Sequence, residues 1–412
     1  MLFRSEKQTM IYIAILLYLL YLTIRYDVLE FNAYKHAHFI VVIIILICVS
    51  GFRYRLGTDT YAYEVKDFEK YSNISNLTIK EFDYFRVQPT WVLINSLGRS
   101  LGGFVYVQII TSVIHIGLWG YVIKRICPTL LFTSLFIYYI FDFTLFNMEV
   151  MREGMAVSLF LCSLVALNDR KYIRYLLFTI AAYLFHSFSL IASFSFFVFY
   201  FLMSRNAYVS VASILIVAVV CISNKNIIVD MLLETVMRSS DTTIAYAANY
   251  ATSQHFGESD YNWKGLLTRF SLPVVYGYML YKTRGIFAKY VNIEWRIFMS
   301  AIFLSMIFMI MVYALVIVGR MYNYFHLFTY LLIALYLKSL YNRFSCPIWR
   351  IRCSACLLFV PFFFATMDNL RADILADTEK NYSRYYPYSS VFDKSIDKKR
   401  EVIMMNKIWM ID

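Results

Sequence analysis

Long apolar runs recur along nearly the whole chain and restrict what it can fold into more than any other feature. A helix crosses the hydrocarbon core of a membrane with about 20 apolar residues, and a single soluble core cannot bury so many such runs. The sequence therefore predicts an all-α polytopic membrane protein with about twelve transmembrane helices. The segments are Met10–Ile24, Ala37–Phe52, Phe104–Ile123, Pro128–Asn147, Arg152–Leu167, Tyr172–Phe185, Ser187–Met203, Ala207–Ser223, Leu266–Tyr281, Arg296–Val318, Met321–Leu337 and Cys353–Met367.

One of these regions is too long to be a single span. Read as one helix, Tyr172–Met203 would extend about 48 Å at the rise of an α-helix, far beyond the thickness of a bilayer. We therefore expect a break near His186 and Ser187.

Composition agrees with a membrane protein and excludes several soluble classes. Hydrophobic residues make up 60% of the 412 residues and charged residues only 16%, against roughly 25% charged residues in soluble domains. This composition excludes a soluble nucleic-acid-binding domain and a small disulfide scaffold. The seven cysteines lie mostly within or beside apolar runs, where cysteine behaves as a small hydrophobic residue. Cys353 and Cys356 form a C-x-x-C pair, but no second pair follows, so we expect no zinc site.

The formal net charge of +12 indicates orientation rather than a nucleic-acid partner. Sixteen Lys and Arg residues and four acids fall in alternate short loops, while the bases and acids elsewhere balance. Cytoplasmic loops carry such an excess, which places the long segments Arg53–Gly103, Asn224–Gly265 and Asp368–Asp412 on the periplasmic face of one transmembrane domain spanning 1–412. Both chain termini fall there too, although Arg4 and Lys7 would favour a cytoplasmic N-terminus if the first segment did not span. Pro89–Leu101 is predicted to be an amphipathic helix lying on the membrane.

Ionisable residues in or beside apolar runs are costly and usually functional. Arg53, Arg55 and Asp59 lie in GFRYRLGTDTYAY, just after the second span. Two guanidinium groups in fork geometry suit phosphate oxygens. The alternative is a juxtamembrane loop with a local Arg–Asp ion pair.

Three further residues on the same face are candidates. Arg152 opens a span between Glu149 and Glu153. It is either neutralised by one of them or forms an anion site at a helix N-terminus. Arg320 opens a later span on the same face, with His326 about two turns deeper, and we expect Arg152 and Arg320 to converge. His186 is either a hydrogen-bonded structural residue or a proton carrier.

The acids of the first long loop are weaker candidates. Asp67 and Glu69 form D-F-E, a pattern with which some lipid-dependent glycosyltransferases hold a metal ion. Their neighbours Lys66 and Lys70 favour a solvated charge run instead, so no metal site is expected.

At these residues the chain resembles the EpsG-like branch of the Wzy polysaccharide polymerases. Two departures stand out: Thr60 follows G-T-D where the family usually has an aromatic residue, and Glu153 stands where glutamine is common. Glu153 would lower the anion affinity of Arg152 if the two paired. The matching pieces are GFRYRLGTDTYAYEVKDF, QPTWVLINSLGRSLGG, FNMEVMREGMAVSLFLCSLVAL, KYIRYLLFTIAAYLFHSFSL and GRMYNYFHLF.

The resemblance implies a GT-C-like glycosyltransferase of the bacterial inner membrane. It would join oligosaccharide repeat units carried on undecaprenyl pyrophosphate at the periplasmic face, for O-antigen, capsule or exopolysaccharide synthesis, and it would use no cofactor. Membrane lipids, a chain-length regulator and a flippase are the implied partners, and nucleic acid is not one. Our hypothesis for such a reaction is that Arg152 and Arg320 hold the pyrophosphate, that Arg53 and Arg55 assist, and that Asp59 or His186 deprotonates the acceptor.

The chemistry fits these residue types. The glycosidic bond breaks through an oxocarbenium-like state, and arginines facing the leaving pyrophosphate would stabilise its developing charge. A flippase for the same lipid and a ligase that transfers finished glycan remain alternatives. An acyltransferase would need a His–acid pair, and His186 has no acid nearby in sequence.

Overall fold

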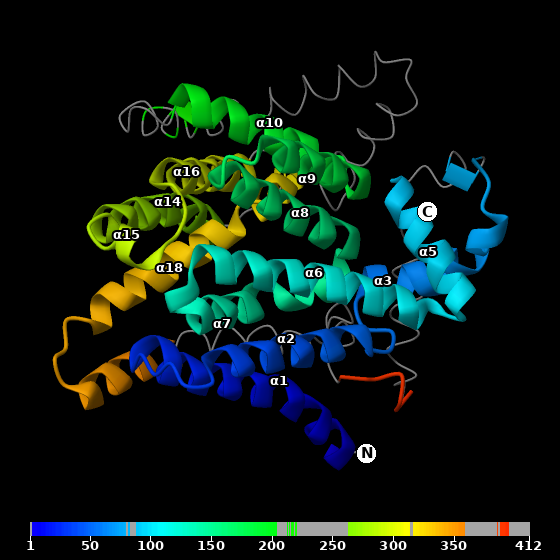
Figure 1. Cartoon of the computed structure of the whole chain (residues 1–412), viewed down its shortest axis with the longest axis horizontal. Coiled ribbons are helices and arrows are strands. Elements are labelled where there is room, and N and C mark those ends of the chain that lie inside the picture. The colour runs from blue at the N-terminus through cyan, green and yellow to red at the C-terminus, as the bar shows by residue number, and fades with distance from the viewer. Residues whose placement is uncertain are drawn as a thin grey trace.

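The computed structural model describes residues 2–79, 81–82, 88–203, 263–313, 316–358, 385 and 388–394, and six positions between 212 and 220. Over these residues the regular elements are helices that lie side by side in a bundle (Figure 1). β pairing there is confined to isolated bridges that join Arg53, Ser390 and Asp393.

The long helices follow the predicted apolar segments closely, since it is their apolar side chains that pack together. A helix over residues 347–358 follows α18. The named helices are α1 (Leu2–Leu22), α2 (Lys35–Gly51), α3 (Thr58–Ala62), α5 (Pro89–Leu101), α6 (Phe104–Ile126), α7 (Leu131–Phe141), α8 (Met151–Asn168), α9 (Tyr172–Phe185), α10 (Phe188–Val198), α14 (Trp263–Thr283), α15 (Phe287–Tyr290), α16 (Trp295–Met311), α17 (Gly319–Asn323) and α18 (His326–Tyr341).

Within the described part of the chain, three helical stretches are long and apolar enough to cross a membrane: Ile11–Val28, Phe104–Ile126 and Met151–Asn168. Six shorter apolar helices accompany them. The predicted span Met321–Leu337 is divided, because α17 ends at Asn323 and α18 begins at His326. The predicted span Ala207–Ser223 lies mostly outside the described residues, as do most of the second long loop and of the tail.

The break in the long apolar region Tyr172–Met203 lies where its length requires one. α9 ends at Phe185 and α10 begins at Phe188, with the His186 backbone extended between them (φ −158°, ψ 122°). The His186 amide still closes the last turn of α9 by donating to the Ala182 carbonyl (3.0 Å). This junction places the His186 side chain at one end of the bundle.

α8 forms the centre of the described bundle. Nearly all of its side chains from Met155 to Ala166 are buried, and Figure 1 shows it between α6 and α9. Gly154 in its first turn allows a close approach, because a Cβ there would come 2.9 Å from the Phe146 carbonyl oxygen. The start of α8 is therefore fixed in position, and Arg152 with it.

One end of the bundle gathers the segments that carry the candidate residues. α2 ends there, α6 and α8 begin there, and α3 and α5 cover it (Figure 1). Residues 388–394 dock on the same end: the Tyr54 amide donates to the Ser389 carbonyl (2.8 Å), and the Val391 amide donates to the Phe52 carbonyl (2.9 Å).

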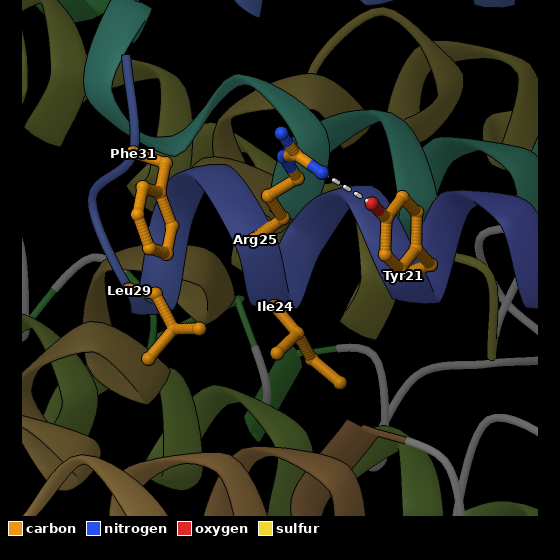
Figure 2. Close-up of a pocket in the computed structure, with 5 residues that line it drawn as sticks. All are labelled: Tyr21, Ile24, Arg25, Leu29 and Phe31. Atoms are coloured by element: carbon orange, nitrogen blue, oxygen red, sulfur yellow. Dashed lines mark hydrogen bonds between the residues drawn. The ribbon is translucent and has the colours of Figure 1, made fainter. Parts of the chain in front are cut away.

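The opposite end is held by a buried carboxylate. Asp27 accepts hydrogen bonds from the Thr133 amide (2.7 Å) and hydroxyl (3.0 Å), and it pairs with Lys35 (3.3 Å). Lys338 donates to the Asp27 carbonyl (2.6 Å). A shallow apolar cavity lies close by, and Figure 2 shows Arg25 on its wall donating to the Tyr21 hydroxyl (2.6 Å). These contacts tie α1, α2, α7 and α18 together.

Candidate functional site

Arg320 lies in α17 and binds groups from two other helices. One guanidinium nitrogen, Nη1, lies 3.2 Å from Nε2 of His186, and Nε lies 3.8 Å from the Glu153 carboxylate. Asn323, one turn further along, donates to the other oxygen of Glu153 (2.8 Å). These contacts hold the Arg320 side chain in place. Because the side chain remains 22% exposed, a ligand can still reach it.

The contact with Arg320 fixes the tautomer of His186. Arginine can only donate, so Nε2 of the imidazole accepts and the proton of the neutral ring is on Nδ1. Nδ1 faces the Tyr324 hydroxyl at 3.4 Å. Burial, together with the positive charges of Arg320 and Arg152, lowers the pKa of His186 to about 3. His186 is therefore a neutral imidazole whose basic nitrogen is already occupied.

Arg152, in the first turn of α8, is held by groups that do not neutralise it. It donates to the side-chain oxygen of Gln88 (3.3 Å), and it lies over the rings of Tyr63 (5.4 Å) and Trp91 (5.9 Å). Cation–π contacts orient a guanidinium without cancelling its charge. Of the two alternatives for Arg152, neutralisation by Glu153 does not occur, because Glu153 pairs with Arg320.

Tyr63 connects the two arginines. Its ring lies under the Arg152 guanidinium, and its hydroxyl is within the electrostatic range of Arg152, Asp59 and Arg320. Burial raises the pKa of Tyr63 to about 12, against the lowering effect of Arg152, so the phenol stays protonated. Arg152 and Arg320, which we expected to converge, both lie within the electrostatic range of Tyr63 and of His186.

Six side chains thus form one site at this end of the bundle. We call them the arginine cluster: Asp59, Tyr63, Arg152, Glu153, His186 and Arg320. They come from α3, the π-helical turn that follows it, α8, the α9–α10 junction and α17. The cluster therefore combines two guanidinium groups with two acids, a neutral phenol and a neutral imidazole, and its arginines are the donors that an anion would use.

Arg53 does not join the arginine cluster. It is fully buried, and it donates to the Ser50 carbonyl, to the Thr60 hydroxyl (3.0 Å) and to the Met151 sulfur (2.9 Å). Burial lowers its pKa to about 10, which leaves it charged at neutral pH. Its contacts join the end of α2, α3 and the start of α8, and its guanidinium has no open approach for a phosphate group.

Thr60, one of the two departures from the family pattern, completes this junction. Its hydroxyl accepts from Arg53 and donates to the Met148 carbonyl (2.6 Å). An aromatic residue could not make both hydrogen bonds, so threonine has a specific structural role here.

Arg55 points away from Arg53 and pairs with Glu64 (3.7 Å). Its guanidinium also lies over the rings of Tyr54 (5.3 Å) and Tyr61 (5.5 Å). Arg55 therefore has a local acid partner in Glu64, while Asp59 interacts electrostatically with Arg152.

The acids of the D-F-E motif form ion pairs within their own loop. Asp67 pairs with Lys70 (3.0 Å), and Glu69 pairs with Arg99 of α5. Among the described residues, no three His, Cys, Asp or Glu side chains are grouped closely enough to hold a metal ion.

Sequence reasoning missed the groups that hold Arg152. Gln88 and Trp91 lie at the start of α5. This helix spans the predicted range Pro89–Leu101, but only part of the apolar face predicted for it is exposed. Trp91 and Ile94 are buried, whereas Leu93, Leu97 and Leu101 remain exposed. The signal was present in the period of the helix: Trp91 and Leu93 cannot share one face.

His326, at the start of α18, forms a His–acid pair. Nδ1 of His326 lies 3.1 Å from Asp142, at the end of α7, and 3.2 Å from the Tyr330 hydroxyl. Asp142 was not anticipated, because it follows an uninterrupted apolar segment.

The comparisons with known proteins agree with this arrangement. A family model described as the EpsG family matches residues 36–390. The chain belongs to the EpsG family. The match runs from α2 to the docked segment 388–394, and so it includes every residue of the arginine cluster. Membership of the EpsG family, with the apolar helices, supports a membrane protein of polysaccharide biosynthesis with a polymerase-type function. No curated protein and no solved structure matches this EpsG-family chain.

Proposed function

We propose that this protein is a polysaccharide polymerase that joins lipid-pyrophosphate-linked oligosaccharide repeat units. The donor is the growing chain on undecaprenyl pyrophosphate, and the acceptor is the incoming repeat unit. The reaction takes place at the periplasmic face of the bacterial inner membrane, with a flippase and a chain-length regulator as partners. The family match supports the polymerase class, and the charge distribution of the loops supports the face.

The observation that carries the proposal is the convergence of Arg152 and Arg320 around the protonated phenol of Tyr63. In the reaction the bond from the sugar C1 to the pyrophosphate oxygen breaks, and a bond from C1 to the acceptor oxygen forms. Negative charge collects on the leaving pyrophosphate as the sugar becomes oxocarbenium-like. Two preorganised guanidinium groups and a phenol hydroxyl stabilise that charge.

The acceptor hydroxyl must lose a proton, and the geometry favours Asp59 as the base. His186 has a depressed pKa, and its basic nitrogen already accepts a hydrogen bond from Arg320. Asp59 lies at the start of α3, is partly exposed, and faces the Arg152 and Tyr63 side of the arginine cluster. In this proposal His186 positions Arg320, and Arg53 positions the first turn of α8 through Met151.

Substitution of the two arginines tests the leaving-group role. Arg152→Ala and Arg320→Ala should each abolish long polymer while the protein stays in the membrane, because loss of one preorganised charge costs roughly 10²–10³-fold in rate. Arg99→Ala is the matched control, since Arg99 lies in the same loop region but pairs with Glu69. Polymer of normal length from both cluster variants would overturn the assignment.

Two conservative variants distinguish the base from the positioning residue. Asp59→Asn removes the proton acceptor and should abolish turnover. His186→Gln keeps an amide oxygen for Arg320 and should retain most of it. The reverse pattern would make His186 the base.

Surface products distinguish a polymerase from a flippase for the same lipid. Cells that lose a polymerase display single repeat units, whereas cells that lose the flippase display none. With purified protein and its lipid-linked repeat unit, a product ladder that a chelator does not reduce would support metal-free polymerisation. No ladder with a verified substrate would count against it.

A further inference from the structure

A second cavity lies beside the arginine cluster, on the other side of Arg53. It measures about 290 Å³, and its walls come from the loop after α2, the turn after α3, the start of α6 and the docked tail segment. Small-molecule sites begin at about 300 Å³, so this space suits one compact ring rather than an oligosaccharide. The residues that the argument uses are Arg53, Tyr54, Glu64, Val105, Gln108 and Lys394.

The polar groups of this cavity are of mixed sign. Glu64 supplies a carboxylate and Lys394 an ammonium group, while Arg53 forms part of the wall. Glu64 and Lys394 are close enough to interact electrostatically. A bound anion would meet the Glu64 carboxylate, and a bound cation would meet the Lys394 ammonium group and the nearby positive charge of Arg53. An uncharged ligand rich in hydroxyl groups avoids both conflicts, because its hydroxyl groups can donate to Glu64 and accept from Lys394.

Gln108 points to a ligand independently of the charges. Its side chain is 2% exposed and lines the cavity, and its amide hydrogen-bonds to none of the described residues. An amide carries both donors and an acceptor. A ligand that offers both a donor and an acceptor, as a sugar hydroxyl does, can therefore hydrogen-bond to it from the cavity.

The cavity also has a short physical connection to the arginine cluster. Arg53, one of the residues that line the cavity, donates to the Met151 sulfur (2.9 Å), and the next residue along the chain is Arg152. Arg53 therefore links the lining of the cavity to the first turn of α8, which carries Arg152.

We propose that this cavity is a saccharide subsite that holds one uncharged sugar ring of the acceptor or of the growing chain. Glu64 and Gln108 bind its hydroxyl groups, and the docked segment 388–394 closes it. This inference rests on the proposed polymerase function and names where a part of that substrate binds.

Binding of free sugars, measured without turnover, tests the subsite. The full chain in lipid nanodiscs is examined by saturation-transfer NMR with the methyl glycosides of glucose, galactose, N-acetylglucosamine and rhamnose. We expect at least one of them to bind. Glu64→Gln and Gln108→Leu should each weaken that binding about tenfold, as expected for the loss of a hydrogen bond in a buried site. Val105→Trp should abolish it by filling the space.

Glu69→Gln is the matched control, because Glu69 is an exposed carboxylate of the same loop, and its binding should equal that of the wild type. The subsite is overturned if none of the four glycosides binds, if the variants bind as well as the wild type, or if inorganic pyrophosphate displaces the sugar. Polymer formation in cells is scored separately. Polymer without glycoside binding removes only the subsite, while glycoside binding without polymer removes the proposed polymerase and leaves the subsite standing.

Discussion

His186 illustrates how a single side chain changes role once its partners are known. From the sequence it was either a proton carrier or a hydrogen-bonded structural residue. In the structure its Nε2 contacts Arg320 and its Nδ1 contacts the Tyr324 hydroxyl. Both ring nitrogens therefore have partners, and the neutral ring sits among positive charges.

The depressed pKa of His186 predicts a dependence of stability on pH. In the unfolded chain a histidine titrates near pH 6.5, and in the fold the pKa is about 3. Between these values the unfolded state binds a proton that the native state excludes, so stability falls as pH drops below about 6.5. We expect the melting temperature of the wild type in detergent to fall more steeply between pH 7.5 and 5.5 than that of His186→Gln. Parallel curves would contradict the buried neutral imidazole.

At the scale of elements, the contact between α3 and the turn before α8 depends on Gly57. Its φ of +90° is one that side chains rarely adopt, and a Cβ at this position would lie 1.8 Å from the Met148 carbonyl oxygen. No side-chain rearrangement relieves a clash with backbone. The glycine of the G-T-D motif therefore sets the distance between Asp59 and α8.

Substitution of Gly57 should accordingly displace α3. Gly57→Ala is expected to destabilise the protein by about 2 kcal/mol or more, since it combines a strained backbone with a steric clash, and to reduce polymer formation with it. Thermal unfolding in detergent measures the first effect. Gly117→Ala is the control, because a Cβ in the middle of α6 meets nothing within 4 Å. Equal melting temperatures for the two variants would show that α3 is not held in this way.

The sequence predicted elements better than it predicted contacts. The break at His186, the range Pro89–Leu101 and the convergence of Arg152 with Arg320 follow from helix length, period and the alternation of faces. The partners do not follow. Glu153 stands beside Arg152 in sequence but pairs with Arg320, because neighbouring residues of a helix point in different directions. Arg53 and Arg55 stand two apart and likewise face different partners.

At the scale of the whole molecule, one end gathers α3, α5, the start of α8 and the docked tail segment, and we assign this end to the periplasm. Membrane-impermeant maleimide tests the assignment on a chain without its native cysteines. Asn76→Cys, in the exposed part of the first loop, should react in intact cells. Arg284→Cys, exposed after α14, should react only after permeabilisation. Labelling in the opposite order would place the arginine cluster in the cytoplasm and end the proposed mechanism.

The docking of residues 388–394 against the loop after α2 has a consequence for biosynthesis. Segments more than 330 residues apart in the chain form one wall, as the Tyr54–Ser389 hydrogen bond shows. A nascent chain that has inserted most of its helices still lacks that wall. On the proposed mechanism, the protein stays inert on the ribosome and gains its complete saccharide site only after the ribosome has translated past residue 394 and this segment has crossed the bilayer.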